Sequence, residues 1–318
     1  MTNQTPLSAA RIDMAHDMID PIFRNSKLLR TEVAGLELLA KDETDNPIRS
    51  FKGRGTGLFL SESSGTDRLV TASAGNFGQG LAYNAARSGR ALTVFASTRA
   101  NPLKIVAMRR FGAEVRLAGD DFDAAKDAGR QFAHENGLMF VEDGASAAIA
   151  EGAGTIAAEL TEEADAIDTF FVPLGNGALA AGTGCWFKAR SQRTRVVAVV
   201  AKGAPCMALS HAEGRVVVTE TAETIADGIA IRSPVPAAVA WLRDTIDDVV
   251  LVDDDAILAA MRFARARWRR FVEPAGAAGL AAILARRESL AGKRVATILC
   301  GGNLTEAQIA AWFRTGED

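Results

Sequence analysis

Lys52 is the first residue whose type and setting could carry chemistry. It follows a turn-forming segment, Asp45-Asn-Pro-Ile, and small residues follow it at Gly53 and Gly55. The amine of a lysine can form a Schiff base with a carbonyl compound, whereas the guanidinium of an arginine does not shed its proton and cannot. A solvated lysine at the start of a helix would explain the same residues, so Lys52 by itself leaves both interpretations open.

Two glycine-rich segments could bind an anion, because each follows an apolar run and precedes a helical pattern. In residues 69–80, the Ser73 hydroxyl, the Asn76 amide and backbone N–H groups could hold a carboxylate or a phosphate, with a helix expected from near Leu81. A tight turn without a ligand is the alternative there. In residues 170–182, the same order predicts a phosphate at the start of the second helix.

The second segment also suggests a dinucleotide-binding fold, which two observations weaken. The third glycine of G-x-G-x-x-G is missing after Gly175 and Gly177, because Ala180 stands in its place. The acidic residue expected after the next strand is missing too, since Ala201 follows the apolar run 196–200. The sequence also contains no G-x-x-x-x-G-K-[ST] loop for a nucleotide.

Cys300 lies where an apolar run, 295–299, opens into a pair of glycines. Parallel sheets place their ligands at the carboxyl ends of their strands, so a small polar side chain there could make one hydrogen bond to a ligand. Plain packing in the core is the alternative for a single cysteine.

The elements that would position these residues alternate along the chain. Short apolar runs rich in Val, Leu or Ile predict strands buried on both faces, and the stretches between them have helical spacing, as in residues 101–111, 124–134, 154–163 and 254–270. This alternation predicts an α/β fold of parallel sheets flanked by helices, with a break near residues 142–146. The expected strands are residues 36–40, 69–71, 91–95, 114–117, 138–141, 169–172, 196–200, 248–251 and 295–299.

The composition excludes several classes of protein. The 318 residues are 48% hydrophobic and 24% charged, and 36 basic against 39 acidic residues give no electrostatic reason to bind nucleic acid or a membrane surface. The uncharged run 169–187 contains Pro173 and several glycines, so a strand, a loop and a helix start explain it better than a membrane span. The N-terminus lacks a basic-then-apolar signal, which predicts a cytoplasmic protein.

Histidine and cysteine are scarce, with three of each. A disulfide framework is excluded at this size, and no two histidines lie within four residues of each other, which excludes a helical two-histidine metal motif. An enzyme of this composition is expected to take its reactive group from a bound cofactor rather than from its own side chains.

Taken in order, seven segments resemble the tryptophan-synthase-like (fold type II) pyridoxal-phosphate enzymes, and most closely their serine/threonine dehydratase branch. The resemblance runs from about Leu36 to Asn303. The seven segments together outweigh the non-functional alternatives given above for the single motifs. The segments are Ser50-Phe-Lys-Gly-Arg-Gly, Ser73-Ala-Gly-Asn-Phe-Gly-Gln-Gly, Glu151-Gly-Ala-Gly-Thr-Ile-Ala-Ala-Glu, Gly175-Asn-Gly-Ala-Leu, Ile225-Ala-Asp-Gly-Ile-Ala, Val272-Glu-Pro-Ala-Gly-Ala and Cys300-Gly-Gly-Asn.

The resemblance implies a role for each matching residue. Lys52 would carry pyridoxal 5'-phosphate and, once freed, remove the Cα proton of the substrate. Phe51 would pack on the pyridine ring, Asn76 would bond its hydroxyl oxygen, and Cys300 would face its nitrogen. The other implied cofactor contacts are Gly175, Asn176, Gly177, Ala178 and Leu179 around the phosphate, Gly228 and Glu273.

The implied substrate site is the loop that would hold the carboxylate of a small amino acid, formed by Ser73, Ala74, Gly75, Asn76 and Phe77. Arg49 stands where many dehydratases have a glycine. It could meet an acidic group of the substrate, such as the second carboxylate of threo-3-hydroxyaspartate, or make a structural contact to backbone or a nearby Asp.

Three departures from the family pattern refine the expectation. Racemases of this group have a Ser where this chain has Ala74, so efficient racemisation is not expected. Metal-binding members have a Glu where this chain has Ala201, so no metal is expected. The phosphate loop contains Asn176 and Ala178 in place of two glycines, and these fit only if their backbone angles suit residues with a Cβ.

The resemblance implies two domains, each a mostly parallel sheet flanked by helices, with the cofactor in the cleft between them. Residues 1–66 and 147–318 would form the large cofactor-binding domain, and residues 67–146 the small domain with the substrate-carboxylate loop. A homodimer is implied as well. The family core ends near Asn303, and the remaining 15 residues are too few for the regulatory domain of the allosteric threonine dehydratases.

The expected function is a pyridoxal-phosphate-dependent ammonia-lyase that converts L-threonine, L-serine or threo-3-hydroxyaspartate to a 2-oxo acid and ammonia. A β- or γ-replacement enzyme, like cysteine synthase or threonine synthase, is the alternative within the enzyme class. A catalytically silent relative that keeps the fold is the alternative outside it.

Overall fold

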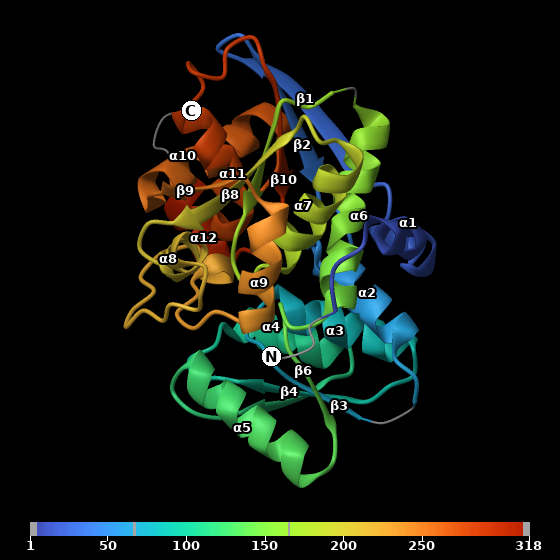
Figure 1. Cartoon of the computed structure of the whole chain (residues 1–318). Helices are drawn as coiled ribbons and strands as arrows, with labels where there is room; N and C mark the ends of the chain where they lie inside the picture. The colour runs from blue at the N-terminus through green and yellow to red at the C-terminus, as the bar shows by residue number, and fades with distance from the viewer. Residues whose placement is uncertain (1–4, 66–67, 165, 314–318) are drawn as a thin grey trace.

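Two sheets organise the chain in the computed structural model, which describes residues 5–65, 68–164 and 166–313. The larger sheet has the order β1-β2-β10-β7-β8-β9 and the smaller one the order β5-β4-β3-β6 (Figure 1). The strands are β1 (Lys27–Val33), β2 (Leu36–Asp42), β3 (Leu69–Ala72), β4 (Leu92–Ala96), β5 (Glu114–Leu117), β6 (Met139–Val141), β7 (Thr169–Pro173), β8 (Arg195–Ala201), β9 (Asp248–Val252) and β10 (Arg294–Leu299).

All nine strands expected from the sequence are present, and their ends differ by at most two residues from those expected. All their pairings with one another are parallel, as their largely apolar sequences predict. A tenth strand, β1, was not predicted from the sequence and pairs antiparallel with β2 from Lys27↔Asp42 to Val33↔Leu36. β1 lies at the edge of the larger sheet. Its exposed and buried residues alternate, so its sequence contains no apolar run.

Helices cover both faces of each sheet (Figure 1). In the larger sheet, α10 and α11 pack on one face, while α6, α7 and α9 pack on the other. In the smaller sheet, α5 packs on one face, while α3 and α4 pack on the other. The helices are α1 (Ala9–Met18), η1 (Pro21–Phe23), α2 (Lys52–Glu62), α3 (Asn76–Arg87), α4 (Pro102–Arg110), α5 (Phe122–Glu135), α6 (Ala147–Glu163), α7 (Ala178–Arg190), α8 (Cys206–Glu213), η2 (Asp227–Ile229), α9 (Pro236–Thr245), α10 (Asp254–Trp268), α11 (Pro274–Ala285) and α12 (Glu306–Phe313).

The first glycine-rich segment turns into its helix earlier than expected. The sequence analysis places the helix start near Leu81, and this is wrong, because α3 begins at Asn76. Gly78 and Gly80 lie inside the helix, where they allow close packing, whereas Gly75 precedes its first residue. A Cβ on Gly80 would come within 3.0 Å of the Lys52 backbone, so α3 lies directly against the start of α2.

The uncharged run 169–187 forms β7, a short loop and the first turns of α7, as expected. Among the described residues, no helix combines the length and apolar character that crossing a membrane requires.

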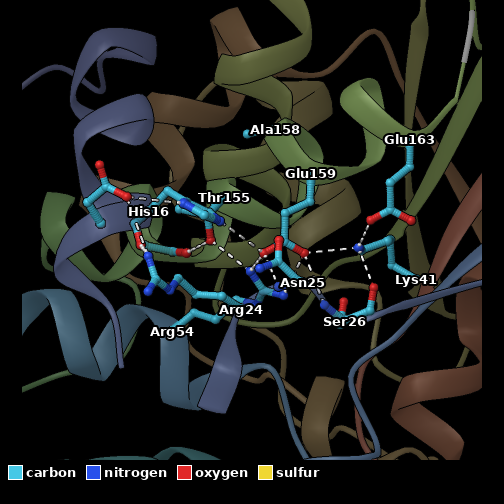
Figure 2. A network of polar contacts seen from close by, with 12 residues as sticks. His16, Arg24, Asn25, Ser26, Lys41, Arg54, Thr155, Ala158, Glu159 and Glu163 are labelled. Carbon is cyan, nitrogen blue, oxygen red and sulfur yellow. Dashed lines mark hydrogen bonds and ion pairs between the residues drawn. The ribbon is translucent and has the colours of Figure 1, made fainter. Parts of the chain in front are cut away.

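A buried ion-pair network fixes the start of α2 (Figure 2). The side chain of Arg54 is fully buried, and its guanidinium lies 2.8 Å from Glu43 Oε1 and 2.6 Å from Glu159 Oε1. Lys41 Nζ adds a second cation, 2.9 Å from Glu159 Oε2, and the backbone N–H of Asn25 donates to Glu159 as well. The network therefore links α2 to α6 and to the segment that follows β2.

We expect Glu159→Gln to lower the free energy of unfolding by about 3–5 kcal/mol, because it leaves the buried Arg54 without one of its two counter-charges. Burial by itself raises the pKa of Glu159, but Arg54 and Lys41 outweigh burial and lower that pKa from 4.5 to about 2. The stabilisation from this carboxylate is therefore present above pH 4.5 and is lost as the pH falls toward 2.

Urea unfolding at several pH values measures this effect. Asp13→Asn is the matched control. It breaks an exposed ion pair, in which Asp13 Oδ2 lies 2.6 Å from Arg190 Nη2, and it should lower the free energy of unfolding by less than about 1 kcal/mol. Equal losses in the two variants would contradict the role of the buried network.

Candidate functional site

One cavity of about 600 Å³ lies between the two sheets, within the size range of small-ligand sites. Its lining brings together every site residue expected from the sequence except Arg49. These residues are Phe51, Lys52, Ser73, Ala74, Gly75, Asn76, Phe77, Gly175, Asn176, Gly177, Ala178, Leu179, Gly228, Glu273 and Cys300.

The amine of Lys52 projects into this cavity from the first residue of α2. Its Nζ lies 2.6 Å from Asp143 Oδ2, 4.6 Å from the centre of the Phe51 ring and 5.9 Å from that of Phe77. The side chain is only 17% exposed. The cavity thus holds a primary amine that is largely shielded from water, on the rigid start of a helix.

Residues 175–179 form an anion cradle at the start of α7. Gly177 has φ +94°, and no side chain caps the helix, so its first N–H groups are available to a ligand. A Cβ on Gly177 would lie 2.7 Å from Ala238 Cβ, and one on Gly175 would lie 2.9 Å from the carbonyl oxygen of Gly228. Neither Asn176 nor Ala178 is among the described residues with positive φ, so Gly177 alone takes the angle that requires glycine and the loop accommodates both Cβ atoms.

A second anion site lies at the start of α3. Ser73 Oγ accepts hydrogen bonds from the backbone N–H groups of Gly75 (3.2 Å) and Gly78 (2.9 Å), which leaves the Ser73 hydroxyl hydrogen to be donated to a ligand. A Cβ on Gly75 would meet no atom within 4 Å, so the backbone here faces open space in the cavity. This arrangement suits a carboxylate.

Asn76 joins this second site to the larger sheet. Its Nδ2 donates to Glu273 Oε1, and its Oδ1 accepts from Asn303 Nδ2 at 2.9 Å. The backbone N–H of Asn303 also donates to Glu273, at 3.2 Å. Burial raises the pKa of Glu273 to about 7, with the negative charge of Asp227 adding to the rise and Lys104 opposing it.

Cys300 lies at the carboxyl end of β10, on the side of the cavity next to Glu273. Burial raises the pKa of its thiol well above 9.0, and the negative charges of Glu273 and Glu43 raise it further. Cys300 is therefore a neutral thiol at neutral pH, able to make a single weak hydrogen bond.

The structure does not bring Arg49 to the cavity. Its side chain is exposed, its backbone has φ +51°, and its carbonyl oxygen accepts a hydrogen bond from Gly302 N at 3.0 Å. This contact is made by the Arg49 backbone, so neither alternative given by the sequence for its side chain is tested by it. The hydrogen bond between the Arg49 carbonyl and Gly302 N holds the turn before Lys52 next to the segment that follows Cys300.

Sequence reasoning missed several polar residues of the cavity. Asp143 follows the end of β6, at the strand edge where ligands bind, but the sequence indicated only a domain break there. Asn303 was quoted only as the end of a motif. Three ion pairs between residues that line the cavity were also missed: Lys104 with Asp227, Lys126 with Glu142, and Arg232 with Asp123.

The family described as "Pyridoxal-phosphate dependent enzyme" matches residues 20–301 of this chain. The chain belongs to this family. The curated L-threonine ammonia-lyase of Geobacter sulfurreducens is 34% identical over 313 residues, which cover 96% of this chain and 78% of that protein. The biosynthetic L-threonine dehydratase of Salmonella typhimurium is 34% identical over 84% of this chain, and the match covers only 53% of that longer protein.

Solved structures of the family have the same fold. The processed form of threonine deaminase isoform 2 from Solanum lycopersicum superposes with a TM-score of 0.89 at 27% identity, over 97% of this chain and 94% of that one. Maize serine racemase also gives a TM-score of 0.89, at 25% identity, over 96% of this chain and 97% of that one. The fold therefore accommodates both elimination and racemisation, and the residues of the site must distinguish them.

The cavity fits pyridoxal phosphate, the cofactor of the family. An amine for its aldehyde lies at Lys52, and the uncapped start of α7 offers N–H groups to its phosphate. Asp143 Oδ1 is buried without a hydrogen-bond partner among the described residues, and Asp143 lines the cavity. This oxygen can therefore accept a hydrogen bond from a ligand. The described residues contain no cluster of three or more His, Cys, Asp or Glu placed to hold a metal ion.

We expect Gly177→Ala to weaken pyridoxal-phosphate binding at least about tenfold, because the positive φ strains any residue with a Cβ and the new methyl group would press on Ala238. Absorbance titration of the cofactor-free protein measures the affinity. Gly35→Ala is the matched control, with φ +77° but no atom within 4 Å of the new Cβ. If Gly177→Ala binds the cofactor as tightly as Gly35→Ala does, residues 175–179 are not its cradle.

Proposed function

We propose that this protein is a pyridoxal-phosphate-dependent ammonia-lyase that converts L-threonine or L-serine to a 2-oxo acid and ammonia. The observation that carries the proposal is the convergence of the Lys52 amine, the Ser73 loop and the cradle of residues 175–179 on one cavity. The similarity to the L-threonine ammonia-lyase of Geobacter sulfurreducens supports the reaction class. threo-3-Hydroxyaspartate becomes a weaker candidate, since Arg49, the residue suggested for its second carboxylate, does not line the cavity.

In this proposal, residues from several elements around the cavity would hold the cofactor. Lys52 would bond its aldehyde carbon, Phe51 would pack on its ring and the N–H groups of residues 175–179 would hold its phosphate. Asn76 would contact the ring hydroxyl and Cys300 the ring nitrogen, and Gly228 and Glu273 would lie beside the ring. When bound, pyridoxal phosphate supplies an electron sink for the pair released from Cα.

The chain's own residues then orient and deprotonate the substrate. Ser73 to Phe77 hold the substrate carboxylate through the Ser73 hydroxyl and backbone N–H groups, which fixes the Cα–H bond relative to Lys52. Lys52 takes the Cα proton, and the β-hydroxyl group leaves as water. The released enamine becomes an imine and hydrolyses to the 2-oxo acid and ammonia.

With pyridoxal phosphate bound, Cys300 would favour elimination over transfer of the amino group. Its neutral thiol would provide no negative charge to keep a proton on the ring nitrogen, whereas an aspartate in the same place would. The cofactor would then supply a weaker electron sink, which would favour loss of the β-leaving group.

We expect wild-type protein with pyridoxal phosphate to release equal amounts of 2-oxo acid and ammonia from L-threonine or L-serine. Lys52→Ala should lower that rate at least about 10³-fold, because it removes both the covalent anchor and the base. Product analysis with an added thiol separates the alternative, since a β-replacement enzyme would give a thioether amino acid instead of the 2-oxo acid.

Racemisation of serine should be at least about 10²-fold slower than pyruvate formation, because Ala74 carries no exchangeable proton for the second face of Cα. Chiral chromatography of L-serine incubations measures it. Interconversion of L- and D-serine as fast as pyruvate formation would contradict the assignment.

Activity should persist in EDTA, since Ala201 replaces the metal-binding Glu of the metal-dependent relatives. Loss of most of the activity on chelation, with recovery on addition of magnesium, would show that this expectation is wrong.

The remaining features of the proposal concern the assembly. We propose that residues 67–146 form the small domain and residues 1–66 and 147–318 the large one, since the smaller sheet lies wholly within residues 69–141. A cytoplasmic homodimer is proposed by analogy with the family.

A further inference from the structure

Asp143 and Lys52, which both line the cavity, form an ion pair. Lys52 Nζ lies 2.6 Å from Asp143 Oδ2, and the two side chains are only 17% and 11% exposed. The rings of Phe51 and Phe77 also lie near Nζ, and they cannot accept a proton. A carboxylate therefore faces the amine that is proposed to act as the base.

The position of Asp143 is fixed by the fold and does not depend on Lys52. Gly144 has φ +86°, and a Cβ there would lie 2.3 Å from the carbonyl oxygen of Asn176, so this segment packs tightly on the anion cradle. Asn176 Nδ2 lies 3.4 Å from Asp143 Oδ2. On the other side, Glu142 pairs with Lys126 and Arg130. The carboxylate thus stays in place when Lys52 moves or changes its charge.

The pairing matters because the charge of Lys52 changes during the proposed reaction. As a free base Lys52 is neutral, and it becomes an ammonium ion when it takes a proton. A newly formed charge in a shielded site is stabilised most by an opposite charge that is already oriented toward it. Asp143 meets this requirement, and its Oδ1 is buried without a hydrogen-bond partner among the described residues.

We propose that Asp143 is a positioning residue for Lys52: its carboxylate holds the ammonium ion that Lys52 becomes on taking the Cα proton, and so makes Lys52 a competent base. This inference rests on the function proposed above. In the step, the Cα–H bond breaks, its proton bonds to the lone pair of Nζ, and the bonding electrons stay with the substrate side. When the C–O bond breaks, the hydroxyl oxygen leaves with that bonding pair and takes the proton from Nζ, which departs with it as water. Asp143 ends the cycle unchanged.

The exchange of the α-proton of L-alanine with D₂O tests the step directly. Alanine has no β-leaving group, so the exchange, followed by proton NMR, reports removal of the Cα proton whether or not elimination occurs. With loaded protein, Asp143→Asn should slow exchange at saturating alanine about 10²-fold with little change in the alanine concentration for half-saturation. Asp143→Glu should recover part of the rate, because it restores the charge.

Asp13→Asn is the control for this experiment, since it removes a carboxylate of an exposed ion pair with Arg190, and its exchange rate should equal that of wild type. The visible absorption band of the bound cofactor should be present in all of these variants. Exchange in Asp143→Asn within twofold of wild type would overturn the proposal. So would a loss that Asp143→Glu fails to recover at all.

Unfolding of the cofactor-free protein supplies a readout that is independent of activity. Thermal midpoints of wild type, Lys52→Met, Asp143→Asn and the double variant form a cycle in which the ion pair predicts non-additive shifts, because the double variant leaves no unpaired charge. Additive shifts would overturn the pair itself, even where a variant binds the cofactor poorly.

The experiments distinguish failure of the proposed function from failure of the proposed role of Asp143. If no 2-oxo acid forms from L-threonine or L-serine but alanine exchange is slow in Asp143→Asn, the proposed substrates are wrong. The positioning role of Asp143 is then still supported.

Discussion

The buried charge of Arg54 is the constraint on which the active-site geometry depends. Its guanidinium is shielded from water, so it must remain between Glu43 and Glu159 or leave unpaired charges inside the protein. Because Arg54 lies in the first turn of α2, this requirement also fixes Lys52, two residues earlier. The close approach of α3 at Gly80 holds the Lys52 backbone from the other side.

The topology places anion sites around that fixed amine. Parallel strands direct their carboxyl ends, and the starts of the helices that follow, toward the same edge of a sheet. As a result the starts of α2, α3, α7 and α11 all contribute residues to one cavity between the two sheets. The positive ends of α3 and α7 suit a carboxylate and a phosphate, which are the two anions that a pyridoxal-phosphate enzyme must hold.

The parts of the structure that could be predicted from sequence are those with a local signal. Apolar runs located nine strands, including the partly exposed edge strands β5 and β9, and glycine-rich motifs located the cavity lining from Ser73 to Phe77 and from Gly175 to Leu179. β1 was missed because Lys27, Arg30 and Glu32 interrupt its apolar residues, which leaves no apolar run. The start of α3 was placed too late because its glycines serve close packing between helices, which a local pattern cannot distinguish from a loop.

Long-range partners could not be predicted. The contact between Lys52 and Asp143 joins residues 91 positions apart, and nothing in either local segment indicates it. Arg49 shows the converse, since its position beside the Ser-Phe-Lys motif suggested a substrate contact that the fold directs elsewhere.

The visible absorption spectrum of the purified protein with pyridoxal phosphate tests the central claim most directly. The geometry predicts a Schiff-base band that is present in wild type and absent in Lys52→Ala, because the Lys52 amine projects into this cavity beside Asp143, which also contacts Asn176 of the anion cradle. A wild-type protein that shows no such band with added pyridoxal phosphate, or a Lys52→Ala variant that keeps it, would contradict the claim.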